Sequence, residues 1–168
     1  LPPGALKMRW TANHDTVSWT FQKKRTRDAY GPARARALLA LACLIDGLPM
    51  IYQGEEDPAI YGGKGESWVA FLARLMVCRK RLPALARGTA AYQAVRASGG
   101  VFACLRESGN DQALVLISLN PEAVSSTLSL PDGWRTLKGW KDALAGEDLA
   151  VSPVPMAGHQ VRVLTPVP

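Results

Sequence analysis

Two consecutive units of the same type in the first half constrain the fold more than any other feature of the sequence. The first unit has a short apolar run at Arg9–Ala12, followed by a helical segment within Gly31–Gly47. The second has an apolar run at Leu48–Gln53, followed by a helical segment within Glu66–Pro83. The order strand–helix–strand–helix builds parallel strands with helices covering the sheet. The first half is therefore predicted to be an α/β unit.

Both helical segments have signals at their ends and an apolar side. Pro32 suits the first turn of the first helix, and Gly47 suits a position just beyond its end. Pro83 stops the second helix, because proline disfavours helical backbone in the residue before it. The helical period predicts the apolar side of the first helix at Leu38, Leu41 and Ile45, and that of the second at Trp68, Phe71, Leu72, Leu75 and Leu82.

Polar residues follow each predicted strand. Asn13, His14 and Asp15 come after the first strand, and Glu55 and Glu56 come after the second. Binding and catalytic sites of parallel α/β folds are built at this edge of the sheet. Structural interpretations stay open beside this one: an Asx turn for the triplet, a hydrogen-bonded core position for its histidine, and carboxylates at a helix entry for the two glutamates.

The pattern changes near Gly88, where short β-prone runs separated by turn residues replace the helical periodicity. Gly109-Asn110-Asp111 is typical of a hairpin loop between two of these runs. We therefore predict a small antiparallel β-sandwich of six to eight strands, with residues 1–87 and 88–168 as two domains. The β-prone runs are Gly100–Ser108, Asp111–Asn120, Ser125–Trp140 and His159–Pro166.

Charge and cysteine content narrow the class of protein. Residues 1–87 hold 14 Lys and Arg against 7 Asp and Glu, whereas residues 88–168 hold 6 against 7. The basic cluster Lys23–Arg27 is the only footprint for a nucleic-acid partner, and it lacks interleaved aromatic residues. The longest apolar run is too short to span a bilayer, so no membrane partner is expected. Three separate cysteines, Cys43, Cys78 and Cys104, are predicted to be buried free thiols rather than disulfides or metal ligands.

Three motifs in this order resemble the α-amylase family of glycoside hydrolases, family 13. They are NHDT at 13–16, GLPMIYQGEE at 47–56 and RKRLPALARG at 79–88, and an all-β tail follows them. The resemblance covers essentially the whole chain. It implies an α/β plus all-β fold, namely the last two βα units of a TIM-type (β/α)8 barrel followed by the family's C-terminal β-sandwich domain.

The resemblance also implies roles for the polar triplet. Asp15 matches the family's third catalytic carboxylate, which stabilises the oxocarbenium-like transition state. His14 matches a histidine that hydrogen-bonds the sugar at the cleavage site, and Asn13 matches the neighbouring residue of this substrate-binding motif. The nucleophile and the acid/base of a retaining glycosidase have no match here, so the chain alone is expected to be inactive.

The parent protein implied by the resemblance is a retaining hydrolase or transglycosidase that acts on α-glucans. Its partners would be an α-glucan or oligosaccharide substrate and the remainder of the catalytic barrel. We expect no cofactor in this chain, and calcium in the parent would be held by residues outside it. The alternative is a non-catalytic structural or glucan-contacting β-sandwich module, which exposed aromatic rings at Tyr92 or Trp134 would favour.

Overall fold

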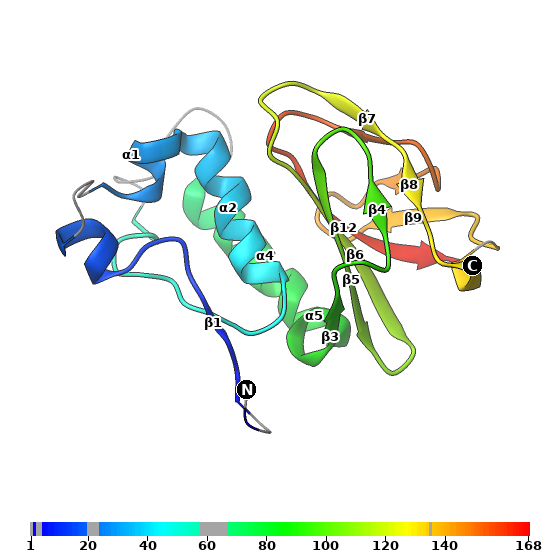
Figure 1. Ribbon diagram of the computed structural model, residues 1–168, viewed down its shortest axis with the longest axis horizontal. Coiled ribbons are helices and arrows are strands. Elements are labelled where there is room, and N and C mark those ends of the chain that lie inside the picture. Colours follow the sequence, from blue (N-terminus) through cyan, green and yellow to red (C-terminus); the bar gives the residue numbers. More distant parts are fainter. Residues whose placement is uncertain (1, 3–4, 20–23, 58–66, 135) are drawn as a thin grey trace.

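The computed structural model describes residues 2, 5–19, 24–57, 67–134 and 136–168, and it places the helices on one side of a large sheet (Figure 1). Helices dominate the first half of the chain and strands the second. The helices are α1 (Thr26–Tyr30), α2 (Pro32–Leu44), α4 (Trp68–Arg81) and α5 (Pro83–Arg87), with a π-helical turn η1 (Asp15–Trp19) and a 3-10 turn η2 (Asp132–Trp134).

The first half contains one parallel strand pair, as predicted. Strands β1 (Met8–Arg9) and β2 (Leu48–Pro49) lie side by side, and the Leu48 N–H donates to the Lys7 carbonyl at 2.8 Å. Both strands are shorter than predicted, and Leu48 is 55% exposed rather than buried. The reason is that each strand has the other as its only partner within the described residues, so the ladder is short and one side of it stays uncovered.

Helix α2 begins at Pro32, as predicted, but its predicted apolar side is wrong. Leu38, Leu41 and Ile45 are only partly buried. Two different sides of the helix are covered instead, one by the large sheet and the other by α4, so small alanine side chains carry much of the contact. Ala37, Ala40 and Leu44 share a core cluster with sheet residues, whereas Ala35, Leu39 and Cys43 pack with Trp68 and Leu72 of α4.

Helix α4 follows the sequence prediction closely. The Ser67 hydroxyl accepts a hydrogen bond from the Ala70 N–H at 3.1 Å, which satisfies one free donor at the helix start. Proline at the first position of α5 then separates the two helices. The predicted apolar side is confirmed, because Trp68, Phe71, Leu72 and Leu75 are buried and Leu82 is partly buried just after the helix.

A six-stranded sheet forms the main part of the second half, and every strand pair in it is antiparallel. Its longest ladder is a hairpin in which Val101 pairs with Ser118 and Ser108 with Asp111. Of the predicted loop Gly109-Asn110-Asp111, the first two residues form the turn, and Asp111 is the first residue of the second strand. In spatial order the strands are β10 (Asp148–Leu149), β9 (Gly139–Asp142), β12 (Val161–Val167), β6 (Asp111–Ser118), β5 (Val101–Ser108) and β3 (Thr89–Ala91).

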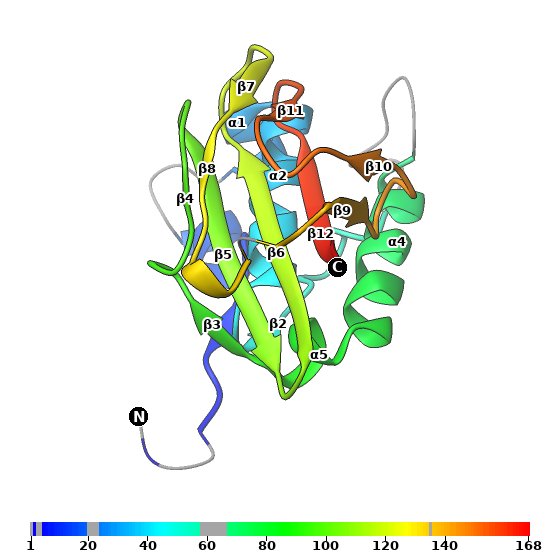
Figure 2. The same ribbon diagram turned by 90° about the vertical axis from the view of Figure 1, so that its right-hand side faces the viewer.

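Two smaller antiparallel ladders lie over the face of this sheet that is turned away from the helices (Figure 2). They bring the described strands after residue 87 to ten, more than the six to eight predicted. The additional strands are two or three residues long, too short to leave a clear alternation in the sequence. The ladders pair β7 (Val124–Ser126) with β11 (Val154–Met156), and β4 (Arg96–Ala97) with β8 (Leu128–Ser129).

Alternate residues of β6 point to two separate cores. Ala113, Val115 and Ile117 belong to a cluster with α2, α4 and α5, whereas Leu114 and Leu116 belong to a cluster that includes Trp134, Trp140 and Met156. The helices of the first half therefore complete one of the two cores of the sheet. The division at residues 87 and 88 remains a prediction.

A buried guanidinium ties the helix ends to the sheet. Arg106 is 1% exposed and donates to four backbone carbonyls. These belong to Leu44 at 2.6 Å, Gly88 at 2.8 Å, Thr89 at 3.1 Å and Leu85 at 3.3 Å. The carbonyls lie at the ends of α2 and α5 and at the start of β3, so one side chain satisfies acceptors in three elements.

All three cysteines are buried free thiols, as predicted. Burial in an apolar environment raises the pKa of Cys43 to about 12 and those of Cys78 and Cys104 to about 11. Because the thiolate is the nucleophile, these residues lack the chemistry of reactive cysteines.

Candidate functional site

The candidate site lies where the chain leaves the parallel pair β1–β2. Beyond β1 the backbone continues through Trp10 and Thr11 to Ala12, which is fully buried. Beyond β2 it turns at Gln53-Gly54 and brings Glu55 back toward the end of β1. The two segments that carry the predicted polar residues therefore meet at the carboxyl edge of the strands, as expected for a parallel pair.

Asn13 closes the first helical turn after β1. Its side-chain oxygen accepts the Thr16 N–H at 2.9 Å, and its own N–H donates to the Thr16 hydroxyl at 2.9 Å. This reciprocal arrangement is a capping box, in which two backbone donors at a helix start are satisfied together. Asn13 therefore acts on the backbone here, as the Asx-turn interpretation of the triplet requires.

His14 and Asp15 lie side by side at the start of η1. His14 Nε2 is 3.1 Å from Asp15 Oδ1, and the two side chains are 70% and 62% exposed. An extended strand would have pointed them to opposite sides, but the helical turn that begins at Asn13 brings them together. An imidazole and a carboxylate thus project from one strand end with open faces for a polar ligand.

Glu55 is the buried carboxylate of the site. It is 1% exposed, and its two oxygens accept from the Thr11 hydroxyl at 2.7 Å and from the Tyr52 N–H at 2.8 Å. Burial raises the pKa of Glu55 more than the hydrogen bonds from Thr11 and Tyr52 lower it. Glu56, by contrast, is exposed and accepts from the Gly54 N–H at 3.0 Å. The two adjacent glutamates therefore differ fully in environment.

Thr11 and Thr26 were not singled out in the sequence. Thr26, the first residue of α1, is 8% exposed and donates its hydroxyl to the Thr11 carbonyl at 2.7 Å. Thr11 lies within the first predicted strand and Thr26 in the segment after it, and nothing local marks either residue, because their partners are distant along the chain. In the sequence, the only indication of a role for these two positions was that each carries a hydroxyl group.

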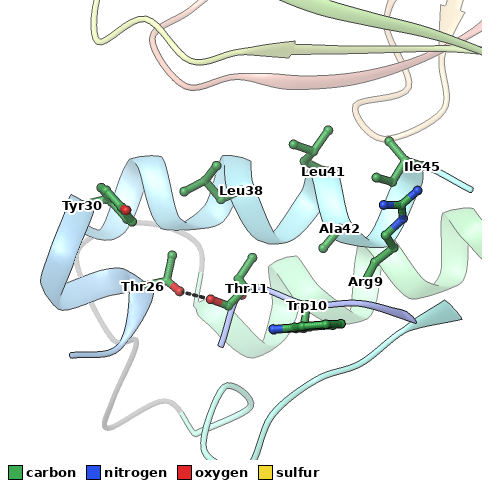
Figure 3. Close-up of a pocket in the computed structure, with 9 residues that line it drawn as sticks. All are labelled: Arg9, Trp10, Thr11, Thr26, Tyr30, Leu38, Leu41, Ala42 and Ile45. Carbon is green, nitrogen blue, oxygen red and sulfur yellow. Dashed lines mark hydrogen bonds between the residues drawn. The ribbon is translucent and has the colours of Figure 1, made fainter. Parts of the chain in front are cut away.

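A cavity of about 320 Å³ lies beside this junction, between the end of β1 and α2 (Figure 3). Figure 3 shows Trp10 and Arg9 on one side of it and Leu38 and Leu41 on the other. Its lining is mostly apolar, and His14 and Asp15 are not part of it. The leucines whose burial was predicted thus border an open space next to the site rather than a closed core.

Two aromatic residues bear on the glucan-contacting alternative, and the basic cluster Lys23–Arg27 bears on a nucleic-acid partner. Trp134 is buried and donates its indole N–H to Gln112 at 3.0 Å, whereas Tyr92 is 42% exposed and its hydroxyl donates to Asp46. In the basic cluster, Lys23 lies outside the described residues, and Arg25 donates to the Gln53 carbonyl at 3.0 Å. One aromatic ring is therefore available for stacking, and at least one cation of the cluster has a partner within the chain.

The described ranges contain no group of three or more His, Cys, Asp or Glu side chains that could hold a metal ion. None of the described helices combines the length and apolar character needed to cross a bilayer.

The chain matches no protein-family model and no curated protein sequence. Among solved structures, it is similar to a noncanonic maltogenic α-amylase, AmyB from Thermotoga neapolitana, with a TM-score of 0.72 and 20% identity over 98% of this chain and 42% of that one. It is also similar to the α-amylase of Geobacillus thermoleovorans complexed with acarbose, with a TM-score of 0.74 and 16% identity over 97% of this chain and 39% of that one. AmyP in complex with maltotriose gives a TM-score of 0.68 and 18% identity over 99% of this chain and 42% of that one.

At these identities the likeness concerns the fold. The chain spans about two fifths of the length of the structures that it matches. The resemblance to the α-amylase family seen in the three motifs is therefore confirmed in three dimensions: this chain has the fold of a portion of an α-amylase.

Proposed function

We propose that this chain is the C-terminal portion of a retaining glycoside hydrolase or transglycosidase of the α-amylase family that acts on α-glucans. In this proposal β1–α2 and β2–α4 are the last two βα units of a (β/α)8 barrel, and the strands after residue 87 form the C-terminal β-sandwich. The remainder of the barrel, and calcium if the parent holds it, would be supplied by residues outside this chain.

The observation that carries the proposal is the position of His14 and Asp15. They lie 3.1 Å apart and exposed, directly after a strand of a parallel pair, in a fold shared with α-amylases. Structures that share this fold contain acarbose or maltotriose, which supports an oligosaccharide as the substrate.

Each residue has a distinct role in the proposed reaction. Positive charge develops at the anomeric carbon in the transition state, and the Asp15 carboxylate stabilises it electrostatically. The His14 imidazole hydrogen-bonds the sugar at the same bond. Asn13 supports both through the capping box that sets the turn.

The carboxylates present in this chain determine whether it can catalyse hydrolysis alone. A retaining enzyme needs a nucleophile and an acid/base about 5–5.5 Å apart. Glu55 is buried with both oxygens engaged, and by its motif Asp15 fits neither role. We therefore expect the isolated chain to show no hydrolysis of maltooligosaccharides or aryl α-glucosides above background.

The test uses the same chain in the complete enzyme, expressed with the sequence encoded upstream of Leu1. We expect hydrolysis or transfer with retention of the anomeric configuration, read by proton NMR of the first product. Asp15→Asn should lower kcat severely with the fold intact, since it removes charge complementarity felt mainly in the transition state. His14→Ala should cost about 2–4 kcal/mol of transition-state stabilisation, which is the typical loss when an enzyme is deprived of one hydrogen-bond donor to the transition state. Turnover by the isolated chain that is abolished in Glu55 or Glu56 variants would refute the proposal.

A non-catalytic glucan-contacting module is the second candidate, and the exposed ring of Tyr92 is the observation that favours it. If it holds, the isolated chain binds maltooligosaccharides, and Tyr92→Ala removes that binding while Asp15→Asn leaves it unchanged. The barrel proposal expects no such binding without the remainder of the enzyme. Calorimetric titration of the isolated chain with maltoheptaose distinguishes the two.

A further inference from the structure

Glu55 connects the two strand ends of the candidate site. Its Oε1 accepts from the Thr11 hydroxyl at 2.7 Å, just beyond β1, and its Oε2 accepts from the Tyr52 N–H at 2.8 Å, just beyond β2. These loops are 44 residues apart in sequence at the Thr11–Glu55 contact. A single buried carboxyl group therefore joins two segments that the short β1–β2 ladder does not reach.

Thr11 is held from a second side as well. Its carbonyl accepts the Thr26 hydroxyl at 2.7 Å (Figure 3). Helix α1 therefore fixes the backbone at the residue whose side chain Glu55 fixes. With both its hydroxyl and its carbonyl engaged, Thr11 has little freedom to rotate or shift. The end of β1 is thus anchored to α1 and to the loop after β2.

From Thr11 the constraint continues along the backbone to the exposed pair. Ala12 is fully buried, and Asn13 closes the next turn through its capping box with Thr16. No residue between Thr11 and His14 is left without packing or a hydrogen bond. A displacement of Thr11 would therefore be passed to the side chains of His14 and Asp15.

Stability alone does not account for a carboxyl group at this position. Burying a charged or polar group costs free energy, which its hydrogen bonds only partly offset, and an apolar residue of similar volume often serves a core as well or better. Burial also makes Glu55 unsuited to direct contact with a substrate, in contrast to the exposed Glu56 beside it.

We propose that Glu55 is a positioning residue, which acts through the Thr11 hydroxyl to fix the strand end from which His14 and Asp15 project. What the positioned pair does rests on the proposed function; the mechanical link itself does not. Glu55 neither touches the sugar nor transfers a proton in this proposal. Glu56, of the same charge and one residue away, provides the matched control.

The first test is made on the whole 168-residue chain by NMR. The sequence contains two histidines, so the imidazole signals of His14 and His159 can be assigned by substitution, and His159 serves as an internal reference. Glu55→Ala should shift and broaden the His14 signal and speed exchange of the Thr16 amide about tenfold or more. In Glu55→Ala, the His159 signal and the amide exchange rates of β5 and β6 should stay unchanged. In the control Glu56→Ala, the His14 signal and the exchange rate of the Thr16 amide should stay unchanged as well.

Two further variants keep the test decisive. Thr11→Val keeps the shape of the side chain but removes the hydroxyl, and it should reproduce the effect on His14 even if Glu55→Ala fails to fold. Glu55→Gln should keep the His14 signal closer to its wild-type position than Glu55→Ala does. The glutamine oxygen can still accept from the Tyr52 N–H, and its NH2 group can donate to the Thr11 hydroxyl. An unchanged His14 signal in folded Thr11→Val or Glu55→Ala would overturn the proposal, as would an equal effect in Glu56→Ala.

The second test is made in the complete enzyme. Misplacement of catalytic groups by about 1 Å costs on the order of 100-fold in rate, so Glu55→Ala should lower kcat about 10- to 100-fold. Its pH–rate profile should keep the wild-type limbs; loss of one limb would identify Glu55 as a titrating catalytic group and overturn the positioning role. A complete enzyme without activity would contradict the proposed function, while the NMR result on the chain would still decide the link.

Discussion

At the scale of single residues, the most consequential side chain outside the candidate site is Arg106. Its guanidinium satisfies carbonyls at Leu44, Leu85, Gly88 and Thr89, and no carboxylate within the described residues pairs with it. The positive charge is instead stabilised by the partial negative charge of carbonyls at helix ends. Nothing in its sequence context, a β-prone run, indicates this role, because all four partners are non-local.

We predict that Arg106→Met lowers the free energy of unfolding by about 3–5 kcal/mol, since it leaves several buried carbonyls without a donor. Urea unfolding followed by circular dichroism measures this change. The control is Arg96→Met, because Arg96 is exposed on a short edge ladder and should change stability by less than about 0.5 kcal/mol. Equal losses in the two variants would contradict the role assigned to Arg106.

Asp46 is a carboxylate through which stability should depend on acid. Its carboxylate accepts from Arg9 at 3.0 Å, from Lys7 at 3.4 Å and from the Tyr92 hydroxyl, which links the start of the chain to the sheet. Partial burial acts to raise the pKa of Asp46, but the hydrogen bonds from Tyr92, Arg9 and Lys7 together lower it from 3.8 to about 2.

Because the folded pKa lies below the unfolded one, Asp46 stabilises the fold above pH 4, and this contribution is lost as the pH falls from about 4 to about 2. Its size is about 2 kcal/mol, given about 1.4 kcal/mol for each pKa unit. Asp46→Asn should flatten that part of the stability–pH curve, measured by urea unfolding between pH 2 and pH 6. An unchanged slope in the variant would show that other carboxylates carry the acid sensitivity.

At the scale of elements, the predictions held where a pattern is local and one-sided. The buried residues of α4 lie along one side of the helix, although Trp68 and Leu72 pack against α2 and the others join the sheet cluster, so the helical period identified them. The β5–β6 hairpin has its turn where Gly109 adopts a φ of +60°, a conformation that glycine favours. In both cases the residues that decide the structure are neighbours in sequence.

The predictions were wrong where packing partners come from several directions. Helix α2 is covered on two sides by different elements, so the single stripe of Leu38, Leu41 and Ile45 was a poor guide to its burial. At the site, the triplet was recognised from its motif, whereas the hydrogen bonds that Thr11 makes with Glu55 and Thr26 could not be predicted, because they join segments distant in sequence.

The elements should differ in local stability. Strands β5, β6 and β12 form the centre of the large sheet and contribute to both cores, whereas β1 and β2 pair only with each other in the described part of the chain. We predict that amide exchange is slowest within 101–119 and 159–164, intermediate in α2 and α4, and fastest in β1 and β2. Protection of β1 and β2 equal to that of β5 and β6 in a monomeric sample would contradict this order.

At the scale of the whole molecule, large apolar side chains are exposed mainly in the first half. Leu38 and Leu41 of α2 do not belong to this set, because they are half-buried along the cavity. An apolar surface of this kind marks a contact that another surface covers. The exposed side chains around β1, β2 and α1 are Leu6 at 72%, Leu48 at 55%, Met8 at 53%, Tyr30 at 51% and Trp10 at 45%.

We predict that the isolated chain self-associates through this surface and binds an apolar dye, and that both properties decline when the remainder of the proposed barrel is present. The double variant Met8→Glu/Leu48→Glu should reduce association, because a carboxylate buried in such a contact is costly. Val167→Glu is the matched control, since Val167 is 38% exposed at the end of β12, on the opposite side of the molecule from β1 (Figure 1). Sedimentation velocity over a concentration series measures the association. If the wild-type chain is a monomer that binds no apolar dye at any concentration, the prediction is wrong.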